Sequence, residues 1–203
     1  MLDEEQKIFI SKAMNGDDQA FTWLVNHWYK RIYNYGYKYF LDHDLASEIA
    51  QKTFIAAHKH ISNINSIDAF NSWLYTIAVN FCREEVRKSK RNRFVSIFSM
   101  AKSNNDLHTK EVKSIKSRQA DPEHSFRKQE LSDYMLKALN ELPLEQKEVL
   151  IMKEFEGLKF REIAVALKIS ENTAKSRLYY GLKTMRNLLI KWEINLEEAN
   201  YGY

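Results

Sequence analysis

The residues best suited to chemistry form a polar and basic group near the C-terminus. At about 100° per residue, one side of a helix contains Asn172, Ser176, Tyr179 and Lys183, with Lys175 and Arg177 at its flanks. Arg and Lys side chains can donate to guanine or to phosphates, and Asn pairs well with adenine. A helix with this face is suited to lie in the major groove of DNA.

Two short helices around a tight turn must hold this face in place. Apolar residues at helical spacing predict the first helix, and they are Phe160, Ile163, Ala164 and Leu167. Ser170 ends the turn and can cap the second helix, whose apolar side consists of Ala174, Leu178, Leu182 and Met185. The pattern is typical of a helix-turn-helix, although a surface helical hairpin without a DNA partner would show the same two faces.

The composition favours a mostly helical protein. Of 203 residues only 5 are Gly and 2 are Pro, whereas 44% are hydrophobic. The formal net charge of +4 is compatible with a nucleic-acid partner. Cys82 is the single cysteine, so no intramolecular disulfide can form, and no apolar run approaches the length of a membrane span. The acidic N-terminus lacks the basic start of a secretory signal, and we expect a cytoplasmic protein.

Two helical domains are predicted, one on each side of a polar segment. Apolar residues at helical spacing follow Asp17, Asp44 and Asp68, which predicts three helices packed as one domain over residues 1–93. Residues 94–121 are rich in Ser, Asn and Lys, and we expect a flexible linker there. A second helical domain, containing the helix-turn-helix, is predicted over residues 122–203. The predicted fold class is therefore all-α, with two small helical domains joined by a flexible linker.

A further helix is expected directly before the helix-turn-helix. Pro143 is tolerated at its start, and Gly157 can end it in the left-handed conformation. The residues predicted to form its buried face are Val149, Leu150, Met152 and Phe155.

Two other segments fit either nucleic-acid binding or a plain structural role. The helix after Asp68 ends in a basic run, which a solvated helix end explains about as well as a nucleic-acid surface: Arg83, Arg87, Lys88, Lys90, Arg91 and Arg93. The connection from His60 to Asp68 is polar and rich in asparagine. It is either an ordinary loop or a recognition loop held by rigid helices.

Four segments between Gly16 and Leu189 resemble, in order and spacing, a bacterial RNA polymerase sigma factor of the sigma-70 family, extracytoplasmic-function group. They read GDDQAFTWLVNHW, DLASEIAQKTFIAAHKHI, AFNSWLYTIAVNFCREEVRKSKR, and ALNELPLEQKEVL followed by FREIAVALKISENTAKSRL. The first three are similar to sigma domain two and the last to sigma domain four. The resemblance implies a factor that binds core RNA polymerase and directs transcription initiation by recognising the −10 and −35 promoter elements.

The second segment is similar to the family's helix that grips the polymerase clamp. The core-binding residues that this implies are Leu45, Glu48, Gln51 and Lys52. Glu48 stands where the family more often has aspartate, which keeps the charge on a longer side chain.

The third segment and the loop before it are similar to the region that captures an unstacked base of the −10 element. The residues implied are Asn63, Asn65, Phe70, Asn71, Asn80, Arg83, Arg87 and Lys88. Phe70 would form a wall for the base, and the cations would attract phosphates of the separated strand. Trp73 fits either the core or stacking on DNA.

The last segment is similar to the region that reads the −35 element. The residues implied are Ser170, Asn172, Thr173, Lys175, Ser176, Arg177 and Tyr180. Ser170 and Thr173 are better suited to a phosphate contact or a helix cap than to base readout.

Three other functions compete with this interpretation. An enzyme is disfavoured because the six histidines are scattered and no HExxH, paired CxxC or glycine-rich phosphate loop occurs, so we expect no metal and no cofactor. Cys82, beside Phe81, fits a packed thiol better than a nucleophile. A stand-alone helix-turn-helix regulator explains the C-terminal half but not the clamp-like and basic helices. A protein-interaction module is the third, and the family also implies an inhibitory protein partner, an anti-sigma factor.

Overall fold

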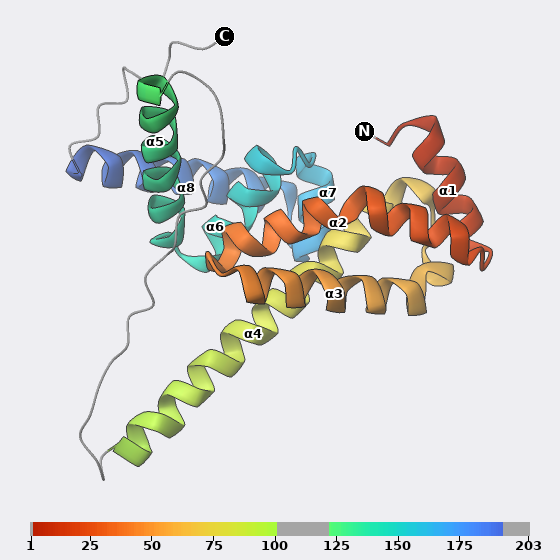
Figure 1. The fold of residues 1–203 in the computed structure, drawn as a ribbon, viewed down its shortest axis with the longest axis horizontal. Helices are drawn as coiled ribbons and strands as arrows, with labels where there is room; N and C mark the ends of the chain where they lie inside the picture. Colours follow the sequence, from red (N-terminus) through yellow and green to blue (C-terminus); the bar gives the residue numbers. More distant parts are fainter. Residues whose placement is uncertain (1, 101–121, 193–203) are drawn as a thin grey trace.

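A computed structural model describes residues 2–100 and 122–192, and every regular element within them is helical (Figure 1). The prediction of an all-α fold is confirmed. The N-terminal unit contains α1 (Glu4–Met14), α2 (Asp18–Phe40), α3 (His43–His60) and α4 (Phe70–Met100), with the short 3-10 turns η1 (Ile61–Asn63) and η2 (Ile67–Ala69) between the last two. The C-terminal unit contains α5 (Pro122–Asn140), α6 (Leu144–Leu150), the π-helical turn η3 (Ile151–Phe155), α7 (Phe160–Leu167) and α8 (Glu171–Lys191).

Local caps start the N-terminal helices where the sequence places acidic residues. The Asp17 carboxylate accepts from the amides of Gln19 and Ala20 at the start of α2, and Asp42 caps α3 in the same way. Helix α1 was missed by the sequence analysis. A capping box between Asp3 and Gln6 starts it, and this pattern was readable in the sequence.

Close packing of α2 against α3 fixes the core of the N-terminal unit. A Cβ built at Gly36 of α2 would lie 3.1 Å from the Cα of Ala46 in α3, so glycine allows the two backbones to approach. Trp28, Ile32 and Tyr35 of α2 are almost fully buried beside this contact. The helices therefore form a rigid base for the loop that follows α3.

Helix α4 continues beyond the predicted domain boundary at residue 93. It runs to Met100, so the first residues of the predicted linker, 94–100, are helical, and Figure 1 shows this helix extending away from the others. Residues 101–121, the rest of the predicted linker, lie outside the described residues. Asp68 lies within η2, two residues before α4 begins.

The helix-turn-helix forms as predicted, but two apolar residues that were expected to be buried, one in α8 and one in the turn before α7, are exposed. Gly157 has a φ of +68° and ends the turn before α7. Phe155 is 42% exposed instead of buried, because the π-helical turn η3 adds a residue to the ladder and the neighbouring Glu156 turns inward instead. Leu182 is 46% exposed, and Gly181 takes its place against Gln146 and Leu150 of α6.

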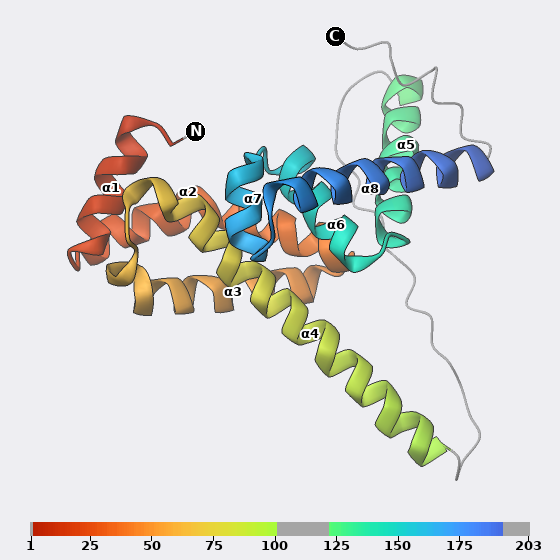
Figure 2. The same ribbon diagram turned by 180° about the vertical axis from the view of Figure 1, so that it is seen from behind.

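The two units pack directly against each other. Helix α7 lies along α4, and α2 contacts both α5 and η3, as the two opposite views show (Figures 1 and 2). This contact was not predicted from the sequence, which indicated two domains and left their arrangement open.

Candidate nucleic-acid interface

The first turns of α8 present most of the predicted −35 residues to solvent. The Ser170 hydroxyl accepts from the Thr173 amide at 3.0 Å and lies 2.8 Å from the Thr173 hydroxyl, so both residues act at the helix cap. Asn172, Lys175 and Ser176 are exposed beyond the cap. The first turns of α8 therefore carry a solvent-exposed polar face, with the positive end of the helix dipole at its start.

Arg177 is less free than its neighbours on α8. Its Nη2 donates to the Glu145 carboxylate of α6 at 2.6 Å, and the side chain is 22% exposed. Tyr180 is 56% exposed and meets Tyr179 edge to face, with 5.5 Å between the ring centroids. Tyr179 was not among the predicted −35 residues, although helical spacing already placed it opposite the apolar stripe.

Four of the predicted −10 residues are open to solvent. Asn63 is exposed at the end of η1, Asn65 is exposed between η1 and η2, and Asn80 and Arg87 are exposed on α4. Asn71 and Arg87 are separated along α4 by roughly 24 Å at 1.5 Å per residue. Lys88, at the far end of this row, pairs with Glu84 at 3.0 Å.

Phe70 is buried and therefore not accessible to a base, although its predicted role requires such access. The side chain is 1% exposed and meets Trp28 edge to face at 5.5 Å, because it belongs to the apolar stripe that packs α4 on α2. The role of Phe70 as an accessible wall for a base is therefore corrected to a core role. Trp73 is half-buried and packs against this cluster.

Arg83 and Asn71 point toward the C-terminal unit. The Arg83 guanidinium holds both oxygens of Glu148 in α6, with Nε to Oε1 at 2.8 Å and Nη2 to Oε2 at 2.6 Å. Hydrogen bonding to this carboxylate raises the pKa of Arg83. Asn71 donates to Glu162 of α7 at 3.3 Å. In this structure both predicted −10 residues are engaged by carboxylates.

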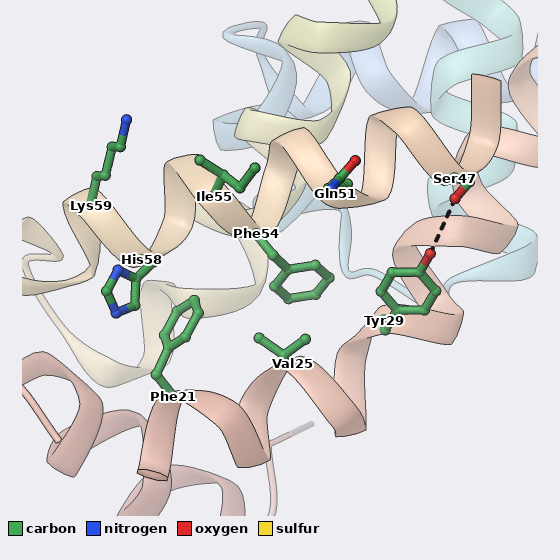
Figure 3. A pocket seen from close by; sticks show the side chains of 9 residues that line it. All are labelled: Phe21, Val25, Tyr29, Ser47, Gln51, Phe54, Ile55, His58 and Lys59. Carbon is green, nitrogen blue, oxygen red and sulfur yellow. Dashed lines mark hydrogen bonds between the residues drawn. The ribbon is translucent and has the colours of Figure 1, made fainter. Parts of the chain in front are cut away.

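The predicted core-binding residues lie on the outer side of α3. Glu48 and Gln51 are exposed, Leu45 and Lys52 are half-buried, and Lys52 forms an ion pair with Glu48. Gln51 also lines a groove of about 590 Å³ between α2 and α3 (Figure 3). The structure thus brings the polar predicted residues to the edge of an apolar depression.

The groove contains residues that the sequence analysis did not select. Phe54 forms its floor, Val25 and Tyr29 come from α2, and Ile55 is 51% exposed at its rim (Figure 3). The signal for Ile55 was present in the sequence, because it follows Gln51 by four residues and so shares its helical face. Tyr29 has no such signal, since its place beside α3 depends on tertiary packing.

The remaining reactive side chain is inaccessible. Cys82 is fully buried, and burial raises the pKa of its thiol well above the usual value. Of the helices in residues 2–100 and 122–192, none combines the length and the apolar character needed to cross a membrane.

Comparison with known families identifies two matching regions. The model for sigma-70 region 2 matches residues 24–92, and the model for sigma-70 region 4 matches residues 132–185. The first range covers most of α2, all of α3 and most of α4, and the second covers the end of α5, all of α6 and α7, and most of α8.

Curated relatives match along most of their length. The RNA polymerase sigma-H factor of Pseudomonas aeruginosa is 27% identical over 180 residues, covering 88% of this chain and 91% of the relative. The ECF RNA polymerase sigma factor SigW of Bacillus subtilis is 27% identical over 183 residues, with coverage of 89% and 94%.

Two solved structures share the fold. CnrH in complex with the cytosolic domain of CnrY has a TM-score of 0.65 at 17% identity, covering 93% of this chain and 99% of that one. The sigma factor RpoE in complex with the anti-sigma factor NepR from Bartonella quintana has a TM-score of 0.63 at 20% identity, with coverage of 83% and 96%.

Proposed function

The chain belongs to the sigma-70 family and is a promoter-recognition sigma factor of the extracytoplasmic-function group. We propose which of its surfaces binds each partner during transcription initiation. The N-terminal unit acts as sigma domain two and the C-terminal unit as sigma domain four. The observation that carries this division is the order of the two matched regions, each of which coincides with one helical unit.

The polar face of α8 binds the −35 element. When α8 lies in the major groove, its exposed side chains reach base edges or phosphates, and these are Asn172, Lys175 and Ser176. Ser170 and Thr173 hold the start of the helix against the DNA backbone. Arg177 and Tyr180 extend the same face along the next turn. Glu145 of α6 orients the Arg177 guanidinium, so the Arg177 side chain is already partly fixed before it contacts a base.

The loop after α3 and the outer side of α4 bind the separated −10 strand. Asn63 and Asn65 offer donors and acceptors to an unstacked base, and Asn80 and Arg87 continue the surface along α4. Arg83, Asn71 and Lys88 join this surface once their carboxylate partners release them.

The outer side of α3 binds core RNA polymerase. Glu48, Gln51 and Lys52 supply polar contacts at the edge of the groove, and Leu45 and the groove residues Tyr29 and Ile55 supply apolar area. A polar rim around an apolar centre is the usual composition of a protein interface. A helix of the polymerase clamp is therefore the partner that this side of the molecule fits.

An anti-sigma factor is proposed as a further partner. The structure of RpoE contains the anti-sigma factor NepR, and CnrH was solved with the cytosolic domain of CnrY. Purification of the chain from its native cell, followed by identification of bound proteins, tests this proposal. We assign the chain no catalytic step and no cofactor, because initiation factors act by binding.

Reconstituted transcription tests the function as a whole. The chain is mixed with core RNA polymerase and a promoter library, and the transcripts and their start sites are sequenced. We expect initiation from a defined subset that shares two sequence elements, one near −10 and one near −35. Stable binding to library DNA with no polymerase association and no initiation would instead indicate a stand-alone regulator.

A further inference from the structure

Three carboxylates of the C-terminal unit are held by donors of the N-terminal unit. Tyr39 and Arg83 donate to Glu148, and Arg31 and Tyr75 contact Glu156. Asn71 donates to the third carboxylate, Glu162, at 3.3 Å. The contact between the two units is therefore more than an apolar surface, since it pairs negative side chains of one unit with cationic or hydroxyl donors of the other.

Glu148 is the most completely enclosed of the three. The residue is 0% exposed, both its oxygens are bonded to Arg83, and Oε1 also accepts from the Tyr39 hydroxyl at 2.9 Å. A carboxylate buried in this way is tolerated only while its partners remain in place. Glu148 thus depends on the packing of the two units for its hydrogen bonds.

The second carboxylate, Glu156, is likewise held by side chains of the N-terminal unit. Tyr75 donates to its Oε2 at 2.5 Å, and Arg31 donates from Nη2 to its backbone carbonyl at 2.6 Å. The π-helical turn η3 directs this residue inward, where a regular helix would have placed Phe155. Local backbone irregularity therefore serves the contact between the units.

The side chains that hold these carboxylates overlap with the proposed −10 surface. Arg83 and Asn71 were assigned to promoter DNA, yet here Glu148 and Glu162 occupy their donors. A carboxylate presents two oxygens to a guanidinium in the same forked geometry as a phosphate. Asn71 is incompletely satisfied in this state, because its Oδ1 is buried and has no hydrogen-bond partner among the described residues.

We propose that this contact is an autoinhibitory latch, in which Glu148 takes the place of a promoter phosphate on Arg83 and withholds this cation from the −10 surface until the units separate. The proposal rests on the proposed function of Arg83 and Asn71. The polymerase-binding residues Glu48 and Gln51 stay exposed in the latched state. Polymerase can thus dock first, and strand capture follows when a phosphate replaces the carboxylate.

Binding of single-stranded DNA by the free, full-length chain tests the latch. The probe is a fluorescently labelled random oligonucleotide of about twelve nucleotides, which reports phosphate contacts irrespective of sequence. The variant is Glu148→Gln, and the radius of gyration from X-ray scattering reports separation of the units. Glu154→Gln is the matched control, because it removes the same charge from an exposed side chain of η3.

We expect Glu148→Gln to bind the probe about tenfold more tightly and to have a larger radius of gyration, because the open state becomes more populated. Glu154→Gln should match the native chain. If Glu148→Gln does not fold, Glu156→Gln carries the same expectation.

Unchanged affinity in Glu148→Gln overturns the latch. Equal tightening in Glu154→Gln also overturns it, since net charge would then explain the effect, and so does tightening without a larger radius. Initiation by the native chain in the promoter-library assay is scored separately. Failure there refutes the proposed function, whichever affinity the variants show.

Discussion

The pair formed by Arg83 and Glu148 provides the sharpest test that the two helical units pack as described. The two residues are 65 positions apart in the sequence, so they interact only if α4 lies against α6. The perturbation is a double-mutant cycle with Arg83→Met, Glu148→Leu and the combined variant. The cycle isolates the energy of the pair from the other effects of each substitution.

The magnitudes follow from the burial of each partner. Arg83→Met leaves a fully buried carboxylate with the Tyr39 hydroxyl as its remaining donor, which costs about 3 kcal/mol. Glu148→Leu costs less, about 2 kcal/mol, because the Arg83 side chain is 33% exposed and stays in contact with water. The combined variant also costs about 2 kcal/mol, since no buried charge is left unpaired, and the interaction energy is then about 3 kcal/mol.

Urea unfolding, followed by circular dichroism at constant salt, measures these free energies. The control cycle uses Glu48 and Lys52, an ion pair between side chains that are 48% and 34% exposed, for which about 0.5 kcal/mol is expected. If the cycle for Arg83 and Glu148 gave no more than the control cycle, the two units would not be packed together in solution and our account of the interface would be wrong.

Three further predictions concern single residues. Arg177→Ala should reduce initiation about tenfold or more at promoters with the preferred −35 sequence and much less at altered ones, as scored by transcription over the promoter library; equal losses would indicate a phosphate contact or a folding defect. Glu48→Lys should weaken binding to core polymerase about tenfold, measured with the full-length chain, while binding to a −35 duplex is unchanged; unaltered polymerase binding would show that the interface lies elsewhere. Burial lowers the pKa of Lys147 from 10.5 to about 8, so the unfolded chain holds more protons than the folded chain between these values. The free energy of unfolding of the native chain, relative to that of Lys147→Met, should therefore rise as the pH increases from about 8 toward 10. Urea unfolding of both chains measures this difference across the range, and a difference that falls with pH would contradict the prediction.

Much of the candidate site could be predicted because its signals are local. Ser170 caps α8 as expected, and the polar residues after it face solvent because Ala174 and Met185 occupy the buried side. Glu48 and Gln51 were selected by the resemblance to the family's clamp-binding helix, and both are exposed on α3. In contrast, Phe70 was assigned to DNA although it belonged to an apolar stripe, and the stripe decided its place.

The errors have a common origin in packing between elements. Helical periodicity gives the faces of a helix but not the exact register of a turn such as η3, which exposed Phe155 and buried Glu156. The same limitation applies to Leu182, which is exposed because Gly181, one position earlier, is the residue that faces Gln146 and Leu150 of α6.

The amino-acid sequence by itself determined the helices, most of their caps, the helix-turn-helix and the chemistry of its outer face, because each depends on residues within a few positions of one another. Only the tertiary structure decided that Arg83 and Asn71 face acidic side chains of the other unit, and that Tyr29 and Ile55 share one groove. Such contacts join residues that are distant in the chain, and the free energy that selects them comes from burial and charge pairing across whole surfaces.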